Sequence, residues 1–484
     1  MKTYETVIGL EVHVELSTAS KIFCSCSTAF GAAPNTQVCE VCAGMPGTLP
    51  VLNRQVVEFA VRAGLATHCD ISRFARFDRK NYFYPDLPKA YQISQLYLPI
   101  CREGWLEIAA GDGSGDGKKR VGIHEIHMEE DAGKLVHDPW DDATLVDYNR
   151  CGVPLLEIVS DPDFRTPEEV LDYLTRLRAI LMFAGVSDCR MQEGSLRADV
   201  NVSVRPAGSD VLGTRTEMKN MNSFKAIARA IAYESRRQIE VLEEGGRIVQ
   251  ETRRWDENKD ASFAMRSKEN ANDYMYFPEP DLPPVHIDEA WLARARAEMP
   301  ALPEALRTRY IDDFGLSAYD AGLLTEVPAT ARLFDEATAR TGQPKEAANW
   351  ILGDFRKMHN EAGIAADEAT IDPDALVAVI RMVSDGRVTR DAARAAFRAA
   401  YLDGADPDAY IREHELEILR DDGALRAIAE KVIATHTGPV ADFCAGKEKA
   451  LQFLIGQCMR ELRGRADAQA VADMLRTLLE ETAE

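Results

Sequence analysis

The sequence lacks the segments that would take a chain into or across a membrane. None of its apolar runs approaches the roughly 20 residues that a membrane-spanning helix needs. Residues 1–9 have neither the basic segment nor the apolar stretch of a secretory signal peptide. We therefore expect a cytoplasmic protein that does not bind membranes and whose ten cysteines stay reduced.

An excess of positive charge is also missing. The 484 residues include 57 lysines and arginines against 79 aspartates and glutamates, and the formal net charge is −22. Proteins that bind nucleic acid usually carry a basic footprint, so the composition argues against such binding but leaves room for a local basic patch. The glycine-rich stretch 111–118 departs from the phosphate-loop pattern, because Lys118 is followed by a second lysine. Any ATP chemistry would therefore need another kind of site.

The chain divides into a sheet-rich part and helical parts. Apolar and polar residues alternate in many stretches up to about residue 290. Four prolines in residues 277–284 exclude a helix or a central strand there, and beyond them Ala, Leu, Arg and Glu recur with helical spacing. A second break follows at residues 404–407. The predicted fold class is α+β, with a large mixed, mainly antiparallel sheet in an N-terminal domain (1–292), an all-α helical domain (293–404) and an all-α tail domain (405–484).

Four cysteines are clustered in residues 24–42. Cys24 and Cys26 form one close pair, and Cys39 and Cys42 form a second after twelve intervening residues. This spacing matches a tetrahedral zinc knuckle. Four incidental core cysteines are the alternative, and a disulfide is disfavoured in a reducing compartment. Because the sequence shows no open ligand position and no activating base, we expect the zinc to be structural.

Carboxylates recur on predicted strands. The strict alternation of residues 8–16 puts Glu11 and His13 on one strand face. Buried carboxylates are costly unless they are paired or bind a metal, and several oxygen ligands with one imidazole suit Mg²⁺. A solvated sheet face without metal is the alternative, and periodicity does not tell which of two consecutive glutamates points inward. The candidates are Glu11, His13, Glu129, Glu130, Glu157 and Asp199.

Basic and amide groups form a third set. Lys80 lies in a stretch, 78–86, that mixes charged with aromatic residues, and Arg197 shares a polar strand face with Asp199. Lys219 closes another alternating stretch and is followed by Asn220. Such groups can contact phosphate or ribose, and an exposed hairpin is the alternative.

Seven long motifs resemble those of one family and occur in its order. The sequence is similar, over essentially its whole length and most strongly before residue 290, to the GatB family, the B subunit of the aspartyl/glutamyl-tRNA(Asn/Gln) amidotransferases. The motifs lie at residues 5–15, 77–86, 127–134, 154–159, 194–199, 219–224 and 276–281.

The resemblance implies a tRNA-dependent amidotransferase, an ATP-dependent carbon–nitrogen ligase. ATP would phosphorylate the side-chain carboxylate of mischarged Glu-tRNA(Gln), Asp-tRNA(Asn) or both. Ammonia, released from glutamine by the amidase subunit of the complex, would then displace phosphate. A third, small subunit is a further implied partner. Residues 1–292 would be the catalytic cradle domain, and the tail domain, residues 405–484, would bind the tRNA.

The same resemblance assigns expected roles to residues of matching motifs. Glu11, His13 and Glu130 are the first choices for binding Mg²⁺ and for catalysis, Glu157 and Asp199 are second choices as magnesium ligands, and Lys80 is a further catalytic candidate. Arg197, Lys219 and Asn220 are expected to contact ATP or its phosphates.

Two functions from other classes remain as alternatives. A metal-dependent phosphohydrolase that uses the same carboxylates would turn over phosphate esters without partner proteins. It would not explain the long helical tail. A non-catalytic zinc-bearing adaptor would show no ATP dependence and would tolerate the loss of Glu11.

Overall fold

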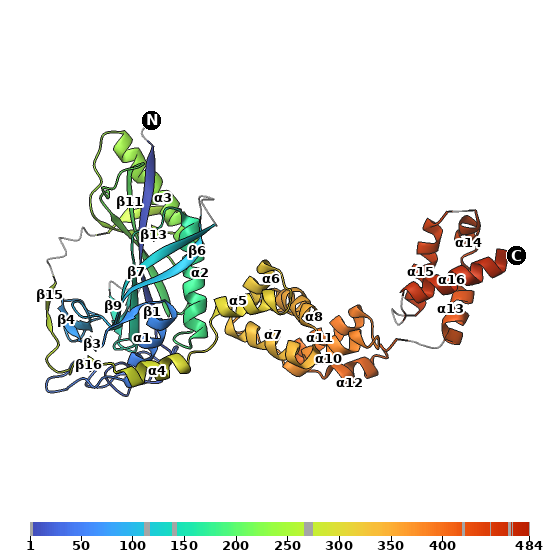
Figure 1. Cartoon of the computed structure of the whole chain (residues 1–484), viewed down its shortest axis with the longest axis horizontal. Helices are drawn as coiled ribbons and strands as arrows, with labels where there is room; N and C mark the ends of the chain where they lie inside the picture. The colour runs from blue at the N-terminus through green and yellow to red at the C-terminus, as the bar shows by residue number, and fades with distance from the viewer. Residues whose placement is uncertain are drawn as a thin grey trace. The chain divides into compact units, whose positions relative to one another are not determined.

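The computed structural model describes residues 3–110, 117–137, 143–265, 274–418, 422–445, 447–462, 466 and 468–483. The chain forms two compact units, Met1–Ala305 and Leu306–Glu484 (Figure 1). The glycine-rich stretch discussed above lies mostly outside the described residues. Within the described ranges, no helix is both long enough and apolar enough to cross a membrane.

A nine-stranded sheet forms the centre of the first unit. Its order is β14-β13-β12-β11-β1-β10-β7-β6-β2, and every neighbouring pair is antiparallel except β12 with β13. The predicted α+β class with a mixed, mainly antiparallel sheet is therefore confirmed. The strands are β1 (Tyr4–Glu15), β2 (Asp70–Ile71), β6 (Cys101–Ala109), β7 (Lys118–Glu130), β10 (Pro154–Ser160), β11 (Leu196–Pro206), β12 (Thr216–Lys219), β13 (Thr252–Asp256) and β14 (Ala261–Ala264).

Alternation along β1 separates an apolar face from a polar one. Leu10, Val12 and Val14 are buried in a core that the sheet shares with helices α1 (Arg54–Ala66), α2 (Pro167–Phe183) and α3 (Phe224–Glu243). Each helix begins at a residue whose side chain accepts a hydrogen bond from the first turn: Asn53, Thr166 and Ser223. Each buried aliphatic side chain contributes about 1.5–3 kcal/mol, so this face joins the sheet to the helices. The other face of the same strands carries the polar side chains.

A three-stranded sheet packs against β7 through its strand β5 (Tyr91–Ser94). Its central strand is β4 (Asp78–Asn81), and its third strand is β15 (Met275–Pro278). Arg79 anchors β4 on one side, because its Nε and Nη2 donate hydrogen bonds of 2.7 and 3.0 Å to the carboxylate of Glu279. Lys80 is therefore directed to the opposite side of β4. Two two-stranded sheets complete the unit: β3 (Phe74–Ala75) with β16 (Val285–His286), and β8 (Lys134–His137) with β9 (Thr144–Asp147).

The first compact unit includes the helix that follows the proline-rich segment. This helix, α4 (Glu289–Ala297), packs on α1, and its Leu292 and Ala295 belong to the same core as the sheet. The domain boundary predicted at residues 292 and 293 thus falls within α4.

The second unit is built of helices throughout its described residues, as predicted. Trp350 and Phe397 pack edge to face in its first part, with ring centroids 5.4 Å apart. The last four helices share a core of their own around Leu454 and Leu475. The helices are α5 (Pro303–Asp312), α6 (Ala318–Leu324), α7 (Pro328–Thr341), α8 (Pro344–Asn349), the π-helix η2 (Trp350–Phe355), α9 (Arg356–Glu361), α10 (Pro373–Ser384), α11 (Arg390–Asp403), α12 (Pro407–Glu413), α13 (Asp422–Thr435), α14 (Thr437–Cys444), α15 (Lys449–Glu461) and α16 (Ala468–Ala483).

Candidate active site and metal sites

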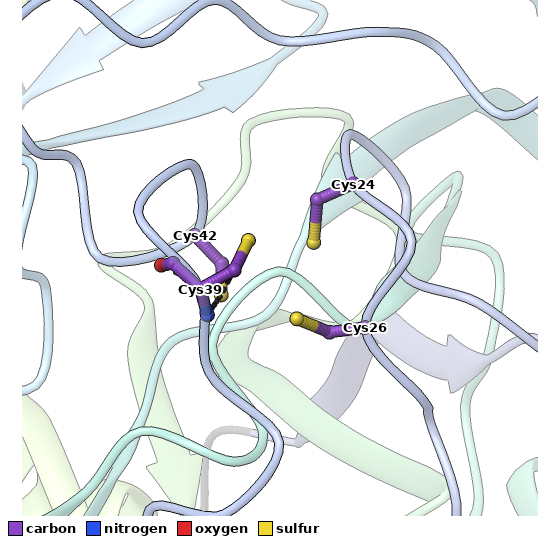
Figure 2. A group of neighbouring side chains, drawn as sticks. All are labelled: Cys24, Cys26, Cys39 and Cys42. Atoms are coloured by element: carbon purple, nitrogen blue, oxygen red, sulfur yellow. Dashed lines mark hydrogen bonds between the residues drawn. The ribbon is translucent and has the colours of Figure 1, made fainter.

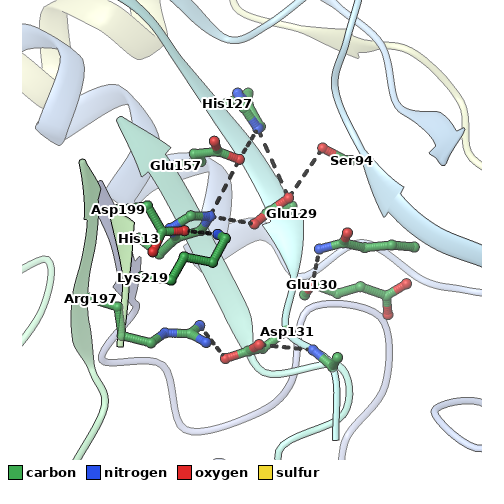
Figure 3. Close-up of polar contacts among 12 residues, drawn as sticks. His13, Ser94, His127, Glu129, Glu130, Asp131, Glu157, Arg197, Asp199 and Lys219 are labelled. Atoms are coloured by element: carbon green, nitrogen blue, oxygen red, sulfur yellow. Dashed lines mark hydrogen bonds and ion pairs between the residues drawn. The ribbon is translucent and has the colours of Figure 1, made fainter. Parts of the chain in front are cut away.

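The polar face of the central sheet gathers most of the predicted site residues (Figure 3). In the strand register Glu11 lies opposite Asp199, and His13 lies opposite Glu157. Directly paired residues present their side chains on the same face of a sheet. The register therefore unites groups that are far apart in the sequence. They are Glu11 and His13 of β1, His127 and Glu129 of β7, Glu157 of β10, Asp199 of β11 and Glu217 of β12.

A first group consists of His13, Glu129 and Glu157. Its ligand atoms all lie within 4.8 Å of one another, and His13 Nε2 is 3.6 Å from Glu157 Oε2 and 3.8 Å from Glu129 Oε1. Burial by itself would lower the pKa of His13, but Glu157 and Glu129 raise that pKa to about 8. Burial and the charge of Glu157 raise the pKa of Glu129. One imidazole nitrogen with two carboxylates is a ligand set that suits a divalent cation.

His127 supports this group from the side. Its Nε2 lies 3.0 Å from Glu157 Oε2, and its Nδ1 lies 3.4 Å from Glu125 Oε1. Burial opposes the charged imidazole, but the two carboxylates raise the pKa of His127 to about 10. An imidazole held between two carboxylates fixes the orientation of Glu157. Sequence analysis missed His127 as a site residue, because only the pairing of β7 with β10 reveals its position opposite Glu157.

A second group consists of Glu11, Asp199 and Glu217, whose carboxylate oxygens also lie within 4.8 Å of one another. Asn201 Nδ2 donates a 2.9 Å hydrogen bond to Glu11 Oε1. Lys219 Nζ forms an ion pair with Asp199 and a second one, at 3.0 Å, with Glu217. Burial and the charge of Glu157 raise the pKa of Glu11. Glu217 was not predicted as a metal ligand, since its proximity to Glu11 depends on the pairing of β12 with β11.

Glu129 and Glu130 point to opposite faces of the sheet. The sequence analysis grouped Glu130 with Glu11 and His13, and the structure brings Glu129 there instead. Glu130 lies on the other face, together with Met128 two residues before it. There its Oε1 accepts a 2.9 Å hydrogen bond from the backbone N–H of Ile93. Glu130 also forms a buried ion pair with Lys89. The physical reason is that the period of two persists to the last residue of β7.

The predicted basic and amide groups separate into two sets. Lys80 lies on the face of the small sheet that borders the first group, since Ser94 of the same face lies 3.4 Å from Glu129 Oε2. Burial lowers the pKa of Lys80, but Glu129 and Tyr276 raise it. Arg197 Nη2 lies 2.5 Å from Asp131 Oδ2 at the end of the same polar face (Figure 3). Asn220 is not brought to this face. It follows the last residue of β12 with a φ of 68°, and its Nδ2 donates a 3.2 Å hydrogen bond to the backbone oxygen of Trp255.

The four clustered cysteines converge, as Figure 2 shows. Their sulfur atoms lie within 4.8 Å of one another, and the sulfurs of Cys39 and Cys42 are 3.9 Å apart. A tetrahedral zinc ion with Zn–S bonds of about 2.3 Å requires sulfurs roughly 3.8 Å apart. The residues therefore fit a structural zinc ion.

Lys21 is a buried lysine behind this cluster. Its Nζ donates a 2.7 Å hydrogen bond to the backbone oxygen of Gln37 and lies 3.6 Å from the sulfur of Cys42. The hydrogen bond from Cys24 and the charge of Lys21 lower the pKa of Cys42 to about 4. Burial of a lysine without a charge partner is costly, so the anionic sulfurs and Lys21 stabilise one another.

Comparison with known proteins was consistent over the whole chain. Residues 6–293 match the family model described as the GatB/GatE catalytic domain, and residues 332–479 match the model described as the GatB domain. A protein of Lachnoclostridium phytofermentans, named as the B subunit of an aspartyl/glutamyl-tRNA(Asn/Gln) amidotransferase, is 55% identical over 99% of both chains. The chain belongs to the GatB family. A protein of the same name from Lachnospira eligens is 53% identical over 99% of this chain and 100% of its own length. Another from Carboxydothermus hydrogenoformans is 52% identical over 99% of both chains.

The match to the GatB/GatE catalytic domain begins within β1 and includes all the other strands of the central sheet. Both carboxylate groups and the four cysteines therefore lie in the segment that corresponds to the catalytic domain of the GatB family. The match to the GatB domain lies within the helical unit, between residues 332 and 479.

Proposed function

We propose that this chain activates and amidates the side-chain carboxylate of Glu-tRNA(Gln), Asp-tRNA(Asn) or both. The two neighbouring carboxylate groups on one rigid sheet face, each beside a lysine, carry the proposal. A carboxylate is a poor electrophile, so a carboxylate oxygen first attacks the γ-phosphorus of ATP and ADP leaves. Ammonia then attacks the acyl carbon, and inorganic phosphate leaves as the amide forms. The chain thus belongs to an ATP-dependent carbon–nitrogen ligase.

The second group, Glu11, Asp199 and Glu217, would hold Mg²⁺ on the phosphates of ATP. Bound Mg²⁺ neutralises phosphate charge during transfer. Lys219 adds a positive charge at the same place. A hollow lined by Glu11, Asn201 and Arg215 adjoins this group, and the nucleotide would bind there.

The first group, His13, Glu129 and Glu157, would hold a second divalent cation near the acyl carboxylate. Lys80 would bind and orient that carboxylate, because it shares a face of the small sheet with Ser94, whose hydroxyl lies 3.4 Å from Glu129. Arg197 is held by Asp131 at the end of the face and would serve as a further anion contact. Glu129 takes the role that the sequence analysis gave to Glu130.

Zinc at Cys24, Cys26, Cys39 and Cys42 would be structural. The four sulfurs complete a tetrahedral ligand set and leave no position for a substrate. Gly44 follows the last ligand with a φ of +67°, and a Cβ there would lie 2.4 Å from Lys89 Cγ, so the turn requires glycine.

Membership of the GatB family supports the proposed partners. The amidase subunit would release ammonia from glutamine, a third, small subunit would complete the complex, and the tail helices within residues 405–484 would bind the tRNA. All these reactions belong to the cytoplasm, where translation takes place.

The decisive experiment reconstitutes the complex of three subunits with ATP, Mg²⁺, glutamine and radiolabelled Glu-tRNA(Gln) or Asp-tRNA(Asn). The amino acid is identified after deacylation. We expect conversion to glutamine or asparagine only when ATP is present. No conversion by a complex with active glutaminase would overturn the proposal. ATP-independent turnover of phosphate esters would then favour a phosphohydrolase, and no turnover at all would favour an adaptor.

A further inference from the structure

Tyrosine rings gather on one face of the three-stranded sheet. Lys80 and Tyr276 are paired across β4 and β15, so their side chains share a face. Because the two strands are antiparallel, Tyr82 follows Lys80 by two residues on the same side on which Tyr274 precedes Tyr276 by two. The ring centroids of Tyr82 and Tyr274 are 5.5 Å apart, and those of Tyr274 and Tyr276 are 6.4 Å apart. We call Tyr82, Tyr274 and Tyr276 the tyrosine platform.

The platform borders the first carboxylate group. The ammonium of Lys80 lies 5.1 Å from the ring centroid of Tyr274 and 5.9 Å from that of Tyr82. On the neighbouring strand β5, the hydroxyl of Ser94 lies 3.4 Å from Glu129 Oε2. The carboxylate of Glu129 also contributes to the raised pKa of Tyr82 and of Tyr276, after the larger effect of burial. The same sheet face therefore connects Lys80, the tyrosine rings and the carboxylates.

The platform is not part of the apolar core. All three tyrosines remain partly accessible to solvent, and the adjacent Phe83 is 89% exposed. A group of accessible aromatic rings beside a polar site is typical of a surface that binds a ligand. Accessible rings next to a cation are the arrangement by which proteins stack unpaired nucleotide bases.

We propose that the tyrosine platform stacks the 3′-terminal base of the aminoacyl-tRNA. This inference rests on the proposed function. The aminoacyl group is esterified to the ribose of the terminal nucleotide, so the side-chain carboxylate and the terminal base are joined through the ester and the ribose. A carboxylate that reaches Lys80 therefore keeps the terminal base in the neighbourhood of this lysine, where the rings of Tyr274 and Tyr82 lie 5.1 and 5.9 Å from its ammonium. Stacking also needs no basic surface, which suits a chain with a net charge of −22.

The position of the platform favours the tRNA end over the adenine of ATP. The platform shares a face of the small sheet with Lys80 and Ser94, and the hydroxyl of Ser94 lies 3.4 Å from Glu129 of the first group. The hollow proposed for ATP instead adjoins Glu11, toward β11 and β12. The two bases would then approach the carboxylates from different sides, as an in-line transfer between their substrates requires.

The test uses the complete complex with the double variant Tyr82→Ala/Tyr274→Ala and its conservative counterpart Tyr82→Phe/Tyr274→Phe. Phe263→Ala is a matched control. Phe263 lies on β14, an edge strand of the main sheet and not of the three-stranded sheet, and it also has a lysine ammonium 5.0 Å from its ring. Competition assays measure the affinity for uncharged tRNA with and without its terminal adenosine. Initial rates give KM for aminoacyl-tRNA and for ATP.

Removing the terminal adenosine should weaken binding to the unaltered complex about tenfold. The alanine variant should bind both tRNAs equally and should show about a tenfold higher KM for aminoacyl-tRNA, with KM for ATP unchanged. The phenylalanine variant and the control should behave like the unaltered complex.

Three results would overturn the platform. The first is a full effect of the terminal adenosine in the alanine variant. The second is a rise in KM for ATP alone, which would assign the rings to the nucleotide. The third is an equal loss in the phenylalanine variant, because stacking does not need the hydroxyl. If the unaltered complex forms no amide, the proposed function itself fails, so the two failures are distinguishable.

Discussion

The two faces of the central sheet use the same strands for opposite purposes. On β1, Leu10 and Val12 pack into the core with three helices, whereas Glu11 and His13 alternate with them and lie on the polar face. The apolar face supplies stability through buried area, and the polar face holds carboxylates close together at an electrostatic cost that lysines and histidines partly offset. Strand alternation thus separates stability from chemistry at the level of single residues. Substitutions at adjacent positions should therefore have different effects.

The largest effect is expected for Glu11→Gln on the polar face. The amidation rate of the complex should fall about 10³-fold, because the amide cannot neutralise Mg²⁺ as a carboxylate does. The unfolding free energy and the affinity for tRNA should stay nearly unchanged. Glu5→Gln is the matched control, since Glu5 lies on the same strand and face but pairs with Arg205, and its rate should remain normal. Equal loss in both variants would contradict a specific role of Glu11.

On the apolar face, Leu10→Ala should have the reverse profile. Removing a fully buried leucine should lower the unfolding free energy by about 3 kcal/mol, because a cavity remains between sheet and helices. The measurement is urea denaturation of the isolated chain, followed by amidation rates normalised to folded protein. A normalised rate that falls together with stability would show that the two faces are not separable.

The variants Glu129→Gln and Glu130→Gln compare the two sheet faces at adjacent residues. Glu129→Gln should weaken the binding of Mn²⁺, a probe for the divalent site, about 10- to 100-fold. Glu130→Gln should leave Mn²⁺ affinity unchanged, because that carboxylate binds Lys89 on the other face. Titration followed by electron paramagnetic resonance measures both affinities. The reverse order would restore Glu130 as the ligand.

A smaller effect is expected at the cysteine cluster. Lys21→Met should speed the release of zinc to a chelator about tenfold, since the sulfurs lose a buried positive neighbour. Lys259→Met is the control, because that side chain is largely exposed and pairs with Asp256 rather than with a cysteine. Zinc content measured against time gives both rates, and equal rates would remove Lys21 from the zinc site.

The smallest effect concerns pH. Glu234 of α3 accepts hydrogen bonds from Thr216 of β12 and from Gln238 and Arg237 of its own helix. Burial opposes the charge of Glu234, but these bonds, led by those from Arg237, lower its pKa below 4.5. A lowered folded pKa stabilises the chain above the unfolded pKa, and this contribution disappears as the pH falls through the folded value. Glu234→Gln should therefore cost about 1 kcal/mol at pH 7 and progressively less in acid, measured by urea unfolding across pH 3–7. A pH-independent difference would contradict this.

The sequence sufficed where a local pattern determines the structure. Alternation along β1 predicted the shared face of Glu11 and His13, and cysteine spacing predicted the sulfur cluster. It did not suffice where a contact depends on strand pairing. Glu217 reaches Glu11 only through the register of β12 on β11. Asn220 directly follows Lys219, the last residue of β12, and its side chain hydrogen-bonds the backbone oxygen of Trp255 instead of joining the polar face.

Glu129 and Glu130 are held on opposite faces of the sheet, and this affects how the sheet folds. A slip of β7 by one residue would turn Glu130 toward the histidines and force Glu129 into the space beside Lys89 and Ile93. Met128 would at the same time leave the core for the polar face. Met128, Glu129 and Glu130 would therefore all be placed unfavourably in the shifted register, which raises its free energy. The end of β7 that carries Glu129 therefore selects its own register during folding, before any substrate or metal is bound.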